Sequence, residues 1–319
     1  MISTFITNKQ GEVMLNDVAR HVKGCLLVPA STQLPVVVAA GATNVPGISP
    51  PIVYEGPNDG VAEIYSLIGQ HLSTDVADVQ DRFTVEITET MYRRRLMNRA
   101  ILARHVFGTT QYPFFLPESL FLENQGTLQF TYSNPSASGA ANFYAILEAR
   151  KFQQVAMMTK SISDYIGDMR QRKQQVCPYW LTSDQAVSIP AGGKATVFFT
   201  ATEDIMLALF FAMAHAISAG VAGDTQEKFT VQFFDAESER PLQNQPVAWN
   251  CAAGSAQRPY VLPTALMMNS NTRMRAEFTN LITDAATEVF YTFHGAALFE
   301  GQIPSPNHLS MPGAAQRGA

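Results

Sequence analysis

The chain of 319 residues contains few cysteines, little charge and no long apolar run. The three cysteines are odd in number and have no metal-ligand spacing, which argues against a disulfide framework and favours folding in a reducing cytosol. Only 15% of the residues are charged and the formal net charge is −5, so a nucleic-acid partner is not indicated. The longest apolar run, Ile205 to Ile217, has 13 residues, whereas a membrane-spanning helix needs about 20. The first 15 residues also lack the apolar core of a secretory signal.

Patterns that carry catalysis are missing as well. The six histidines have no HxxxH or HxH spacing, and there is no GxSxG motif. The glycines at 41–47 and 191–194 lack the spacing of a phosphate-binding loop and precede strand-like segments. We therefore predict no catalytic residue, no cofactor and no metal site, although a triad built from distant segments stays open as an alternative.

The sequence does contain an internal repeat, offset by 146 residues. Segments 82–120 and 228–266 align without a gap and share 12 identities in 39 positions. With one inserted residue, the alignment extends to place Phe143 on Phe290 and Phe152 on Phe299. Because repeats decide architecture before any local pattern does, the chain is predicted to contain two related domains.

Short alternating or β-branched segments bounded by turn residues predict strands in both copies. They lie at 34–40, 83–87, 127–132, 142–147, 196–200, 205–214, 229–234, 273–279 and 288–293. The segment 91–105 resembles a basic helix, but its partner 237–251 contains Pro241 and Pro246, so both are interpreted as extended or looped. The fold class is mainly β, with two tandem, duplicated antiparallel β-sandwich domains of jelly-roll-like type.

Residues outside the repeat complete the domain plan. Apolar residues from Val155 to Met169 follow a helical period, which predicts a connecting amphipathic helix over 151–177, ended by Pro178. Residues 1–30 are expected to be an extended N-terminal arm and residues 301–319 a C-terminal tail. The two sandwich domains would then span 31–150 and 178–300.

One loop differs in charge between the copies. The loop carries Arg93, Arg94 and Arg95 in the first copy and the acidic Asp235, Glu237 and Glu239 in the second. These six residues are candidate protein contacts, because a basic loop of one subunit can meet an acidic loop of another. Solvated charges, a divalent-ion site on the acidic loop and phosphate contacts from the arginines remain alternatives.

A second shared feature is the segment Gly-x-x-Gln-x-Pro-aromatic-x-Leu-Pro. Its prolines cannot donate to a sheet, so we interpret it as a rigid corner that crosses from one sheet to the other. The corner residues are Gly108, Pro113, Pro117, Gly254, Pro259 and Pro263. Separately, Trp180 and Trp249, with Tyr179 and Tyr260, could form a sugar-stacking platform, so a glycan partner stays possible.

The doubled pattern FTV, Arg-x-Leu-x-Asn, Gly-x-x-Gln-x-Pro-aromatic-x-Leu-Pro and aromatic-Tyr resembles virion structural proteins of tailed bacteriophages, of the minor head, neck (collar) or capsid-decoration type. The resemblance implies a non-enzymatic protein of the virion, made and assembled in the host cytoplasm. It implies contacts with itself as a homo-oligomer and with capsid, portal or tail proteins. The alternative is a tail-associated module that binds a receptor or a glycan.

Overall fold

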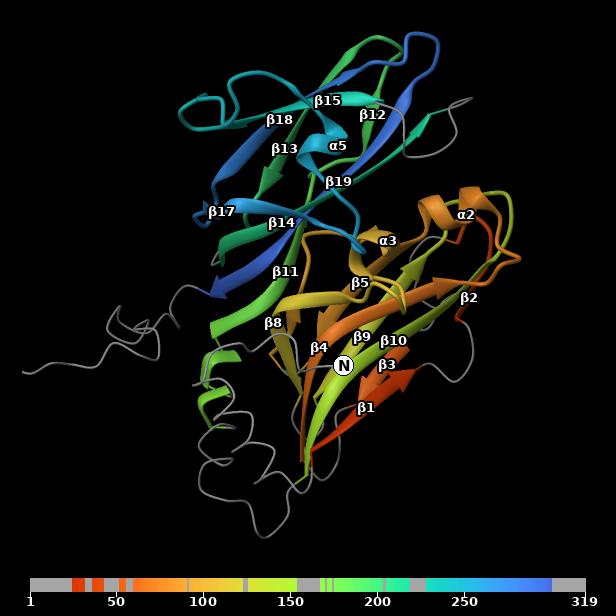
Figure 1. Cartoon of the computed structure of the whole chain (residues 1–319), viewed down its shortest axis with the longest axis vertical. Helices are drawn as coiled ribbons and strands as arrows, with labels where there is room; N and C mark the ends of the chain where they lie inside the picture. Colours follow the sequence, from red (N-terminus) through yellow and green to blue (C-terminus); the bar gives the residue numbers. More distant parts are fainter. Residues whose placement is uncertain are drawn as a thin grey trace, which may run out of the picture. The chain divides into compact units, whose positions relative to one another are not determined.

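A computed structural model of the chain describes most of the two repeats (Figure 1). The described residues are 25–31, 36–42, 52–55, 60–90, 92–122, 126–153, 167–169, 171–173, 175–202, 205–218 and 228–299. They form two compact units. Unit 1 is Met1–Leu96 with Leu102–Lys173, and unit 2 is Met97–Ile101 with Gln174–Ala319.

Unit 1 is built from two antiparallel sheets. The first has the order β1-β10-β4-β8, with β2 also on β10; its strands are β1 (Cys25–Ser31), β2 (Val36–Val38), β4 (Gly60–His71), β8 (Phe114–Leu122) and β10 (Ala141–Gln153). The second has the order β3-β9-β5-β6, with β7 on β5; its strands are β3 (Ile52–Glu55), β5 (Thr84–Glu89), β6 (Arg94–Arg95), β7 (Ile101–Leu102) and β9 (Thr127–Ser133). Two short helices connect strands, α2 (Ala77–Arg82) and α3 (Ala103–Val106).

Unit 2 repeats this plan. Its first sheet has the order β11-β19-β14-β17, with β12 on β19; the strands are β11 (Val176–Thr182), β12 (Val187–Ile189), β14 (Ile205–Ser218), β17 (Tyr260–Met268) and β19 (Thr287–Phe299). Its second sheet has the order β13-β18-β15-β16, with β13 (Lys194–Thr200), β15 (Phe229–Asp235), β16 (Val247–Ala248) and β18 (Arg273–Asn280). The helical turn α5 (Trp249–Ala252) lies 146 residues after α3.

The strand orders match when each strand is paired with its repeat partner, with β16 in the place of β7 and the isolated bridge between Phe234 and Pro241 in the place of β6. Each sheet joins strands that are distant in sequence, such as β1 with β10 and β11 with β19, which is the arrangement of a double-sheet jelly roll. The chain is therefore a tandem pair of jelly rolls, which confirms the predicted fold class.

Aromatic side chains fill the space between the sheets of each unit. Phe83 stacks on Tyr132 with ring centroids 5.5 Å apart, and the repeat partner Phe229 meets Phe278 edge-on at 5.6 Å. All four rings are at most 2% exposed. Burying side chains of this size supplies much of the apolar stabilisation of a sandwich core.

A bulge shows that the repeat register needs no inserted residue. In unit 1 the pairing of β10 with β4 shifts between Glu148 and Ala149. In unit 2 the pairing of β19 with β14 shifts between His294 and Gly295. Both positions differ by 146, so the expected insertion was wrong and Phe143 corresponds to Val289. The expected alignment matched Phe143-Tyr144 with Phe290-Tyr291, which lie 147 residues apart and so one position out of register.

The boundaries expected at 1–30 and 151–177 also change. Cys25–Ser31 forms β1 and pairs with β10, so these residues belong to a sheet and not to an arm. Strand β10 continues to Gln153, helical residues are described at 167–169, 171–173 and 175, and β11 begins at Val176. Residues 151–153 and 176–177, expected to be helical, are therefore strand residues, because sheet pairing takes precedence over the helical period. Residues 154–166, 1–24 and 300–319 lie outside the described part.

The segment 91–105, expected to be extended or looped, contains strands β6 and β7 and ends in α3. Leu96 and Ile101 are buried on either side of an irregular stretch. The single turn of α3 was not expected from the sequence. Its repeat partner α5 forms although Pro246 lies three residues before it, because a proline that precedes a helix does not interrupt its hydrogen bonds.

Candidate functional site

The basic loop of the first copy is the turn between β5 and β6. Arg93 is exposed and has a φ of 54°, and the exposed Arg95 forms an ion pair with Glu86 at 2.8 Å. Arg94 differs from both. It is only 8% exposed, and its Nη1 donates to the Lys173 carbonyl at 2.7 Å. Of the three arginines, Arg93 and Arg95 are therefore available at the surface of the unit.

A buried cluster of charges lies behind this loop. The guanidinium of Arg94 is 4.6 Å from the centre of the Tyr92 ring. Glu89, paired with Arg94 across the hairpin, is 3% exposed. Burial raises the pKa of Glu89 to about 7, and the positive charges of Arg94 and Lys173 limit the rise.

Glu118 of β8 completes the cluster. It accepts from Lys173 Nζ at 2.8 Å and also pairs with Arg172. Burial acts to raise the pKa of Glu118, but these two cations outweigh it and lower the pKa. The helical residues at 171–173 thus cover both the first hairpin and strand β8 within unit 1. No sequence pattern predicts this cover, since the repeat partner of Glu118 is Thr264 and not an acidic residue.

The acidic loop of the second copy occupies the matching turn after β15. Asp235 accepts from the Glu237 backbone N–H at 3.1 Å and from Ser238 Oγ at 2.7 Å. The hydrogen bond from Ser238 lowers the pKa of Asp235, so this carboxylate is charged at neutral pH. Asp235, Glu237 and Glu239 are all exposed. Glu239 has a φ of 52°, which matches the left-handed geometry of Arg93 and shows that the two turns share one backbone shape.

The leucines just after each hairpin make the same backbone hydrogen bond but differ in exposure. The Leu96 N–H donates to the Ile87 carbonyl at 3.0 Å, and the Leu242 N–H donates to the Phe233 carbonyl at 2.8 Å. Leu96 is 0% exposed, whereas Leu242 is 48% exposed. The shared leucine is therefore a core residue in the first copy and a surface residue in the second.

Residues 97–101, which we name the latch segment, fold as part of unit 2. The Asn98 side chain donates to the Thr182 carbonyl at 2.7 Å and accepts from the Thr182 N–H at 3.0 Å. The Asn98 N–H also points at the Trp180 carbonyl, at 3.4 Å, and Met97 forms a parallel bridge with Trp180. The latch segment thus adds to the outer edge of β11. Asn98 was one of the repeat identities, so its conservation between the copies was a usable signal.

Strand β17 is the edge of its sheet and exposes apolar side chains. Val261 is 62% exposed, Met267 is 54% exposed and Tyr260 is 37% exposed. In the matching strand β8, Phe114 and Phe121 are 2% and 1% exposed, whereas Phe115, the repeat partner of Val261, is 56% exposed. Exposed apolar edge strands are sites at which other chains can bind.

The corner segment links the sheets as a tight structural turn. Gly108 donates to the Leu67 carbonyl at 3.1 Å and accepts from the Gly69 N–H at 2.9 Å, while Gly254 bonds in the same way to Ala212 and Ala214, at 3.0 Å each. A Cβ at Gly108 would lie 2.2 Å from the Tyr112 carbonyl oxygen. The chain then enters β8 or β17. Pro113 and Pro259 immediately precede these strands, and Pro117 and Pro263 lie within them.

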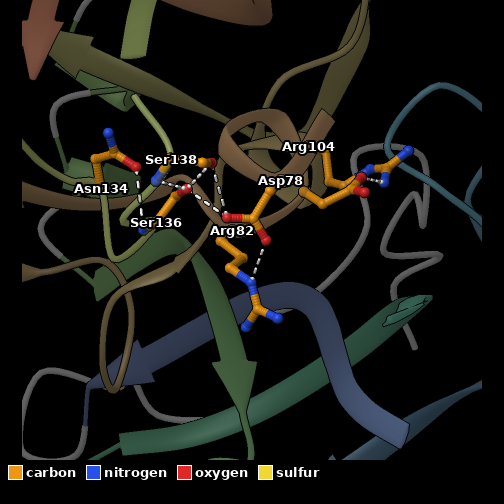
Figure 2. A network of polar contacts seen from close by, with 7 residues as sticks. Asp78, Arg82, Arg104, Asn134, Ser136 and Ser138 are labelled. Atoms are coloured by element: carbon orange, nitrogen blue, oxygen red, sulfur yellow. Dashed lines mark hydrogen bonds and ion pairs between the residues drawn. The ribbon is translucent and has the colours of Figure 1, made fainter. Parts of the chain in front are cut away.

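A polar network ties the loops of unit 1 together at α2 (Figure 2). Figure 2 shows Asp78 directed at Ser136 and Ser138, with Arg82 bonded to its other oxygen at 2.8 Å. These hydrogen bonds lower the pKa of Asp78, and the one from Ser136 has the largest effect. The Asn134 Oδ1 accepts from the Ser136 N–H at 3.2 Å.

Asn134 of this network has a repeat partner with the same role in unit 2, Asn280. Asn134 Nδ2 donates to the Gly139 carbonyl at 2.8 Å, and Asn280 Nδ2 donates to the matching Ala285 carbonyl at 2.9 Å. Both asparagines are at most 3% exposed. Their identity in the two copies follows from this loop-closing role and not from a reaction.

The aromatic residues suggested for sugar stacking do not form a surface platform. Trp180, Tyr179 and Trp249 are 0%, 2% and 5% exposed, respectively, which corrects that alternative because a stacking face must be open to the sugar. Tyr260 is exposed, but it belongs to the apolar strand β17.

The histidines that the structure describes are mainly core residues. His71 bonds to Asp75 at 2.9 Å and packs against Phe83 and Phe143, with ring centroids 5.1 and 4.9 Å away. Burial lowers the pKa of His71 despite Asp75, and burial lowers the pKa of His294 to about 3. In the described ranges, no group of three His, Cys, Asp or Glu side chains could hold a metal ion.

Comparisons with known proteins follow the fold. No family model matches the sequence, and no curated protein matches it. Similar solved structures include a chain of Sulfolobus turreted icosahedral virus, at 10% identity over 86% of this chain and 91% of that one, with a TM-score of 0.39. The infectious bursal disease virus VP2 subviral particle is similar at 9% identity over 87% of this chain and 74% of that chain, with a TM-score of 0.23. The ANX2 ectodomain from Arabidopsis thaliana is similar at 10% identity over 83% of this chain and 89% of that chain, with a TM-score of 0.22.

The first and second of these are viral particle structures, and the third is a plant ectodomain. Similarity at these TM-scores assigns no function, and the jelly-roll assignment rests on the strand order. Among the described helices, none is both long and apolar enough to span a membrane.

Proposed function

We propose that the chain is a non-enzymatic structural protein of a virus particle, which assembles with copies of itself and with other virion proteins. The finer role follows the sequence resemblance: a component of a bacteriophage head or neck, bound to capsid, portal or tail proteins. Jelly rolls serve in viral capsids and in other binding proteins, so the fold alone does not choose among these roles.

The observation that carries the proposal is the exposed apolar edge of β17. Val261, Met267 and Tyr260 lie along a strand that pairs on one side with β14 and has no second partner among the described residues. A protein that stays monomeric normally blocks such an edge with charges, prolines or a covering segment. Strand β17 contains Pro263 but no charged residue, which supports a role in which another protein covers it.

The two hairpin turns add charge complementarity to the proposal. Arg93 and Arg95 are exposed on the first turn, and Asp235, Glu237 and Glu239 are exposed on the second. Opposite charges on matching turns can set the register between neighbouring subunits. Arg94 does not take part in such a contact, because it is buried behind Tyr92.

The test compares assembly of the full chain with assembly of a β17 variant. The purified protein should show a concentration-dependent increase in sedimentation coefficient and form a defined particle in electron micrographs. Val261→Asp should raise the protein concentration needed for half assembly by roughly tenfold, while the circular dichroism spectrum stays unchanged. A wild-type chain that remains monomeric at high concentration and does not bind phage heads would contradict the proposal.

A further inference from the structure

The latch segment shows how a short stretch of this chain binds the edge of the jelly roll of unit 2, of which it forms part. It uses three backbone groups of β11: the Trp180 carbonyl, the Thr182 carbonyl and the Thr182 N–H. All three point away from β19, the strand that β11 pairs with on its other side. The contact depends on backbone groups and one asparagine, so it does not require a particular side chain on the receiving strand.

The second repeat carries the same motif at its surface. Arg94, Leu96 and Asn98 recur as Arg240, Leu242 and Asn244. Leu242 holds the same backbone hydrogen bond as Leu96, so the following residues leave the hairpin in the same direction. Residues 240–242 and 244–246 are exposed. We name residues 243–247 the second latch.

The first jelly roll has an edge strand that matches β11. Ser31 pairs with Ile146, and Thr182 pairs with Thr292, which lies 146 residues after Ile146. Strand β1 is therefore the partner of β11, with Ser31 in the place of Thr182 and Pro29 in the place of Trp180. In the described part of the chain, β1 is the terminal strand of its sheet.

The groups that a latch needs are present on β1. Ser31 supplies an N–H and a carbonyl, and Pro29 supplies a carbonyl, which is the group that the Asn98 N–H faces on Trp180. Pro29 has no N–H, so the backbone contact at this position depends on its carbonyl alone. A proline at the edge also disfavours simple strand-to-strand aggregation, while it leaves the asparagine contact possible.

We propose that the second latch binds the outer edge of β1 in a second copy of this chain, with Asn244 bonded to Ser31 as Asn98 is bonded to Thr182. Residues 97–101 bind the first strand of unit 2, of which they form part, and the equivalent residues 243–247 would bind the first strand of unit 1 in another copy. The contact is head-to-tail, so a closed ring results if the rotation per subunit closes. This inference rests on the proposed self-assembly and names the surfaces that carry it.

Substitutions in the second latch, at Leu242 immediately before it and in β1 test the contact. Asn244→Ala and Leu242→Asp should each raise the protein concentration needed for half assembly by roughly tenfold or more. Ser31→Pro should do the same, because it removes the N–H that Asn244 would accept from. The matched control is Leu281→Asp, which places the same charge at a leucine that is 42% exposed and should assemble like the wild type.

A cross-link decides between binding in trans and binding within one chain. In a background with Cys25→Ser and Cys251→Ser, one chain carries Asn244→Cys and another carries Ser31→Cys. Oxidation of the mixture should give a disulfide-linked dimer that neither chain gives alone at the same yield, since strand neighbours fall within disulfide range. A chain that carries both Asn244→Cys and Ser31→Cys should form no internal disulfide at high dilution.

The outcomes separate this inference from the proposed function. If the wild type assembles and the latch variants assemble equally well, the inference fails and the proposed function stands. If the doubly substituted chain closes on itself at high dilution, the latch acts in cis and the inference also fails. If the wild type never assembles, both fail. Circular dichroism spectra that match the wild type are required of each variant, and the cross-link does not depend on destabilising substitutions.

Discussion

The two jelly rolls have the same strand order, yet equivalent residues are buried in one and exposed in the other. Leu96 and Phe121 are at most 1% exposed, whereas Leu242 and Met267 are 48% and 54% exposed. The backbone hydrogen bonds at the two leucines are alike. The shared backbone therefore does not decide whether a side chain is buried. Unit 1 also has the ion pair of Lys173 with Glu118 on β8.

This comparison teaches that duplication preserves a fold more strictly than it preserves a surface. Residues that shape the backbone are the same in both copies, such as the corner glycines and the loop-closing Asn134 and Asn280. Residues around them have diverged according to whether they meet protein or solvent. Pairs of matched substitutions can therefore separate the common structural roles from the roles of one unit.

The largest effect is expected at the corner glycines, where the units should respond equally. In Gly108→Ala and Gly254→Ala, the new Cβ would lie 2.2 Å from the Tyr112 carbonyl oxygen and 2.0 Å from the Arg258 carbonyl oxygen. Each substitution should lower the free energy of unfolding by about 4 kcal/mol or more, measured by urea denaturation. Gly139→Ala is the control, because no atom lies within 4 Å of its Cβ. Tolerance at one corner alone would break the equivalence of the units.

The matched leucines should respond unequally. Leu96→Ala removes a side chain that is 0% exposed and should cost about 2 to 5 kcal/mol. Leu242→Ala, at 48% exposure, should change the unfolding free energy of the unassembled chain by less than about 0.5 kcal/mol. Urea denaturation at a concentration below assembly measures both. Equal costs would show that the surface of the second copy is covered within one chain.

Glu89 should give unit 1 a pH dependence that the exposed Asp235 does not give unit 2. The pKa of Glu89 in the folded state is about 7, raised from 4.5. The folded state holds the proton of Glu89 more tightly than the unfolded state does. The stability that this proton contributes is therefore fully present below pH 4.5 and is lost as the pH rises through about 7. The loss should be about 3 kcal/mol, and Glu89→Gln should abolish it.

Optical probes can assign that effect to one unit. Both tryptophans, Trp180 and Trp249, lie in unit 2, so tryptophan fluorescence follows unit 2 while circular dichroism follows the whole chain. The pH-dependent transition should appear in circular dichroism and be weak in fluorescence. An unchanged pH dependence in Glu89→Gln would remove Glu89 as its source. Asp235→Asn is the matched control.

The smallest effect is expected at the exposed basic turn. Arg95→Ala breaks an ion pair with Glu86 in which the arginine side chain is 55% exposed. Such pairs contribute about 0 to 1 kcal/mol, so urea denaturation should show almost no change. The same variant should weaken assembly at low salt if Arg95 meets an acidic turn of another subunit. A large loss of folding stability would instead give Arg95 a role inside unit 1.

Much of the fold was predictable because it depends on local patterns. Alternation identified β5, β9, β15 and β18 almost to the residue, and the turn at 190–193 correctly preceded β13. The long strand β4 was missed, since Gly69 and polar residues interrupt its apolar pattern. The corner motif was visible as a repeat, but its reason, the contact of Gly108 with the Tyr112 carbonyl, depends on a fold-back that no spacing reveals.

The candidate contact residues were predictable by charge and not by exposure. Arg93 and Arg95 lie at the surface, as does the acidic turn, but Arg94 is buried against Tyr92 and Lys173. Consecutive residues of a hairpin point to opposite faces, and sequence alone does not tell which face another segment covers. Asn98 was visible as a repeat identity, while its bond to Thr182 joins residues 84 positions apart.

Two related β modules follow from the amino-acid sequence alone, because the repeat, the strand alternation and the turn residues are all local properties of the chain. The jelly-roll strand order, the burial of Leu96 against the exposure of Leu242, and the addition of Asn98 to the edge of β11 become known only from the folded chain. Strand order and burial depend on contacts between distant segments, and a local pattern does not encode which of several chemically suitable segments comes to lie against it.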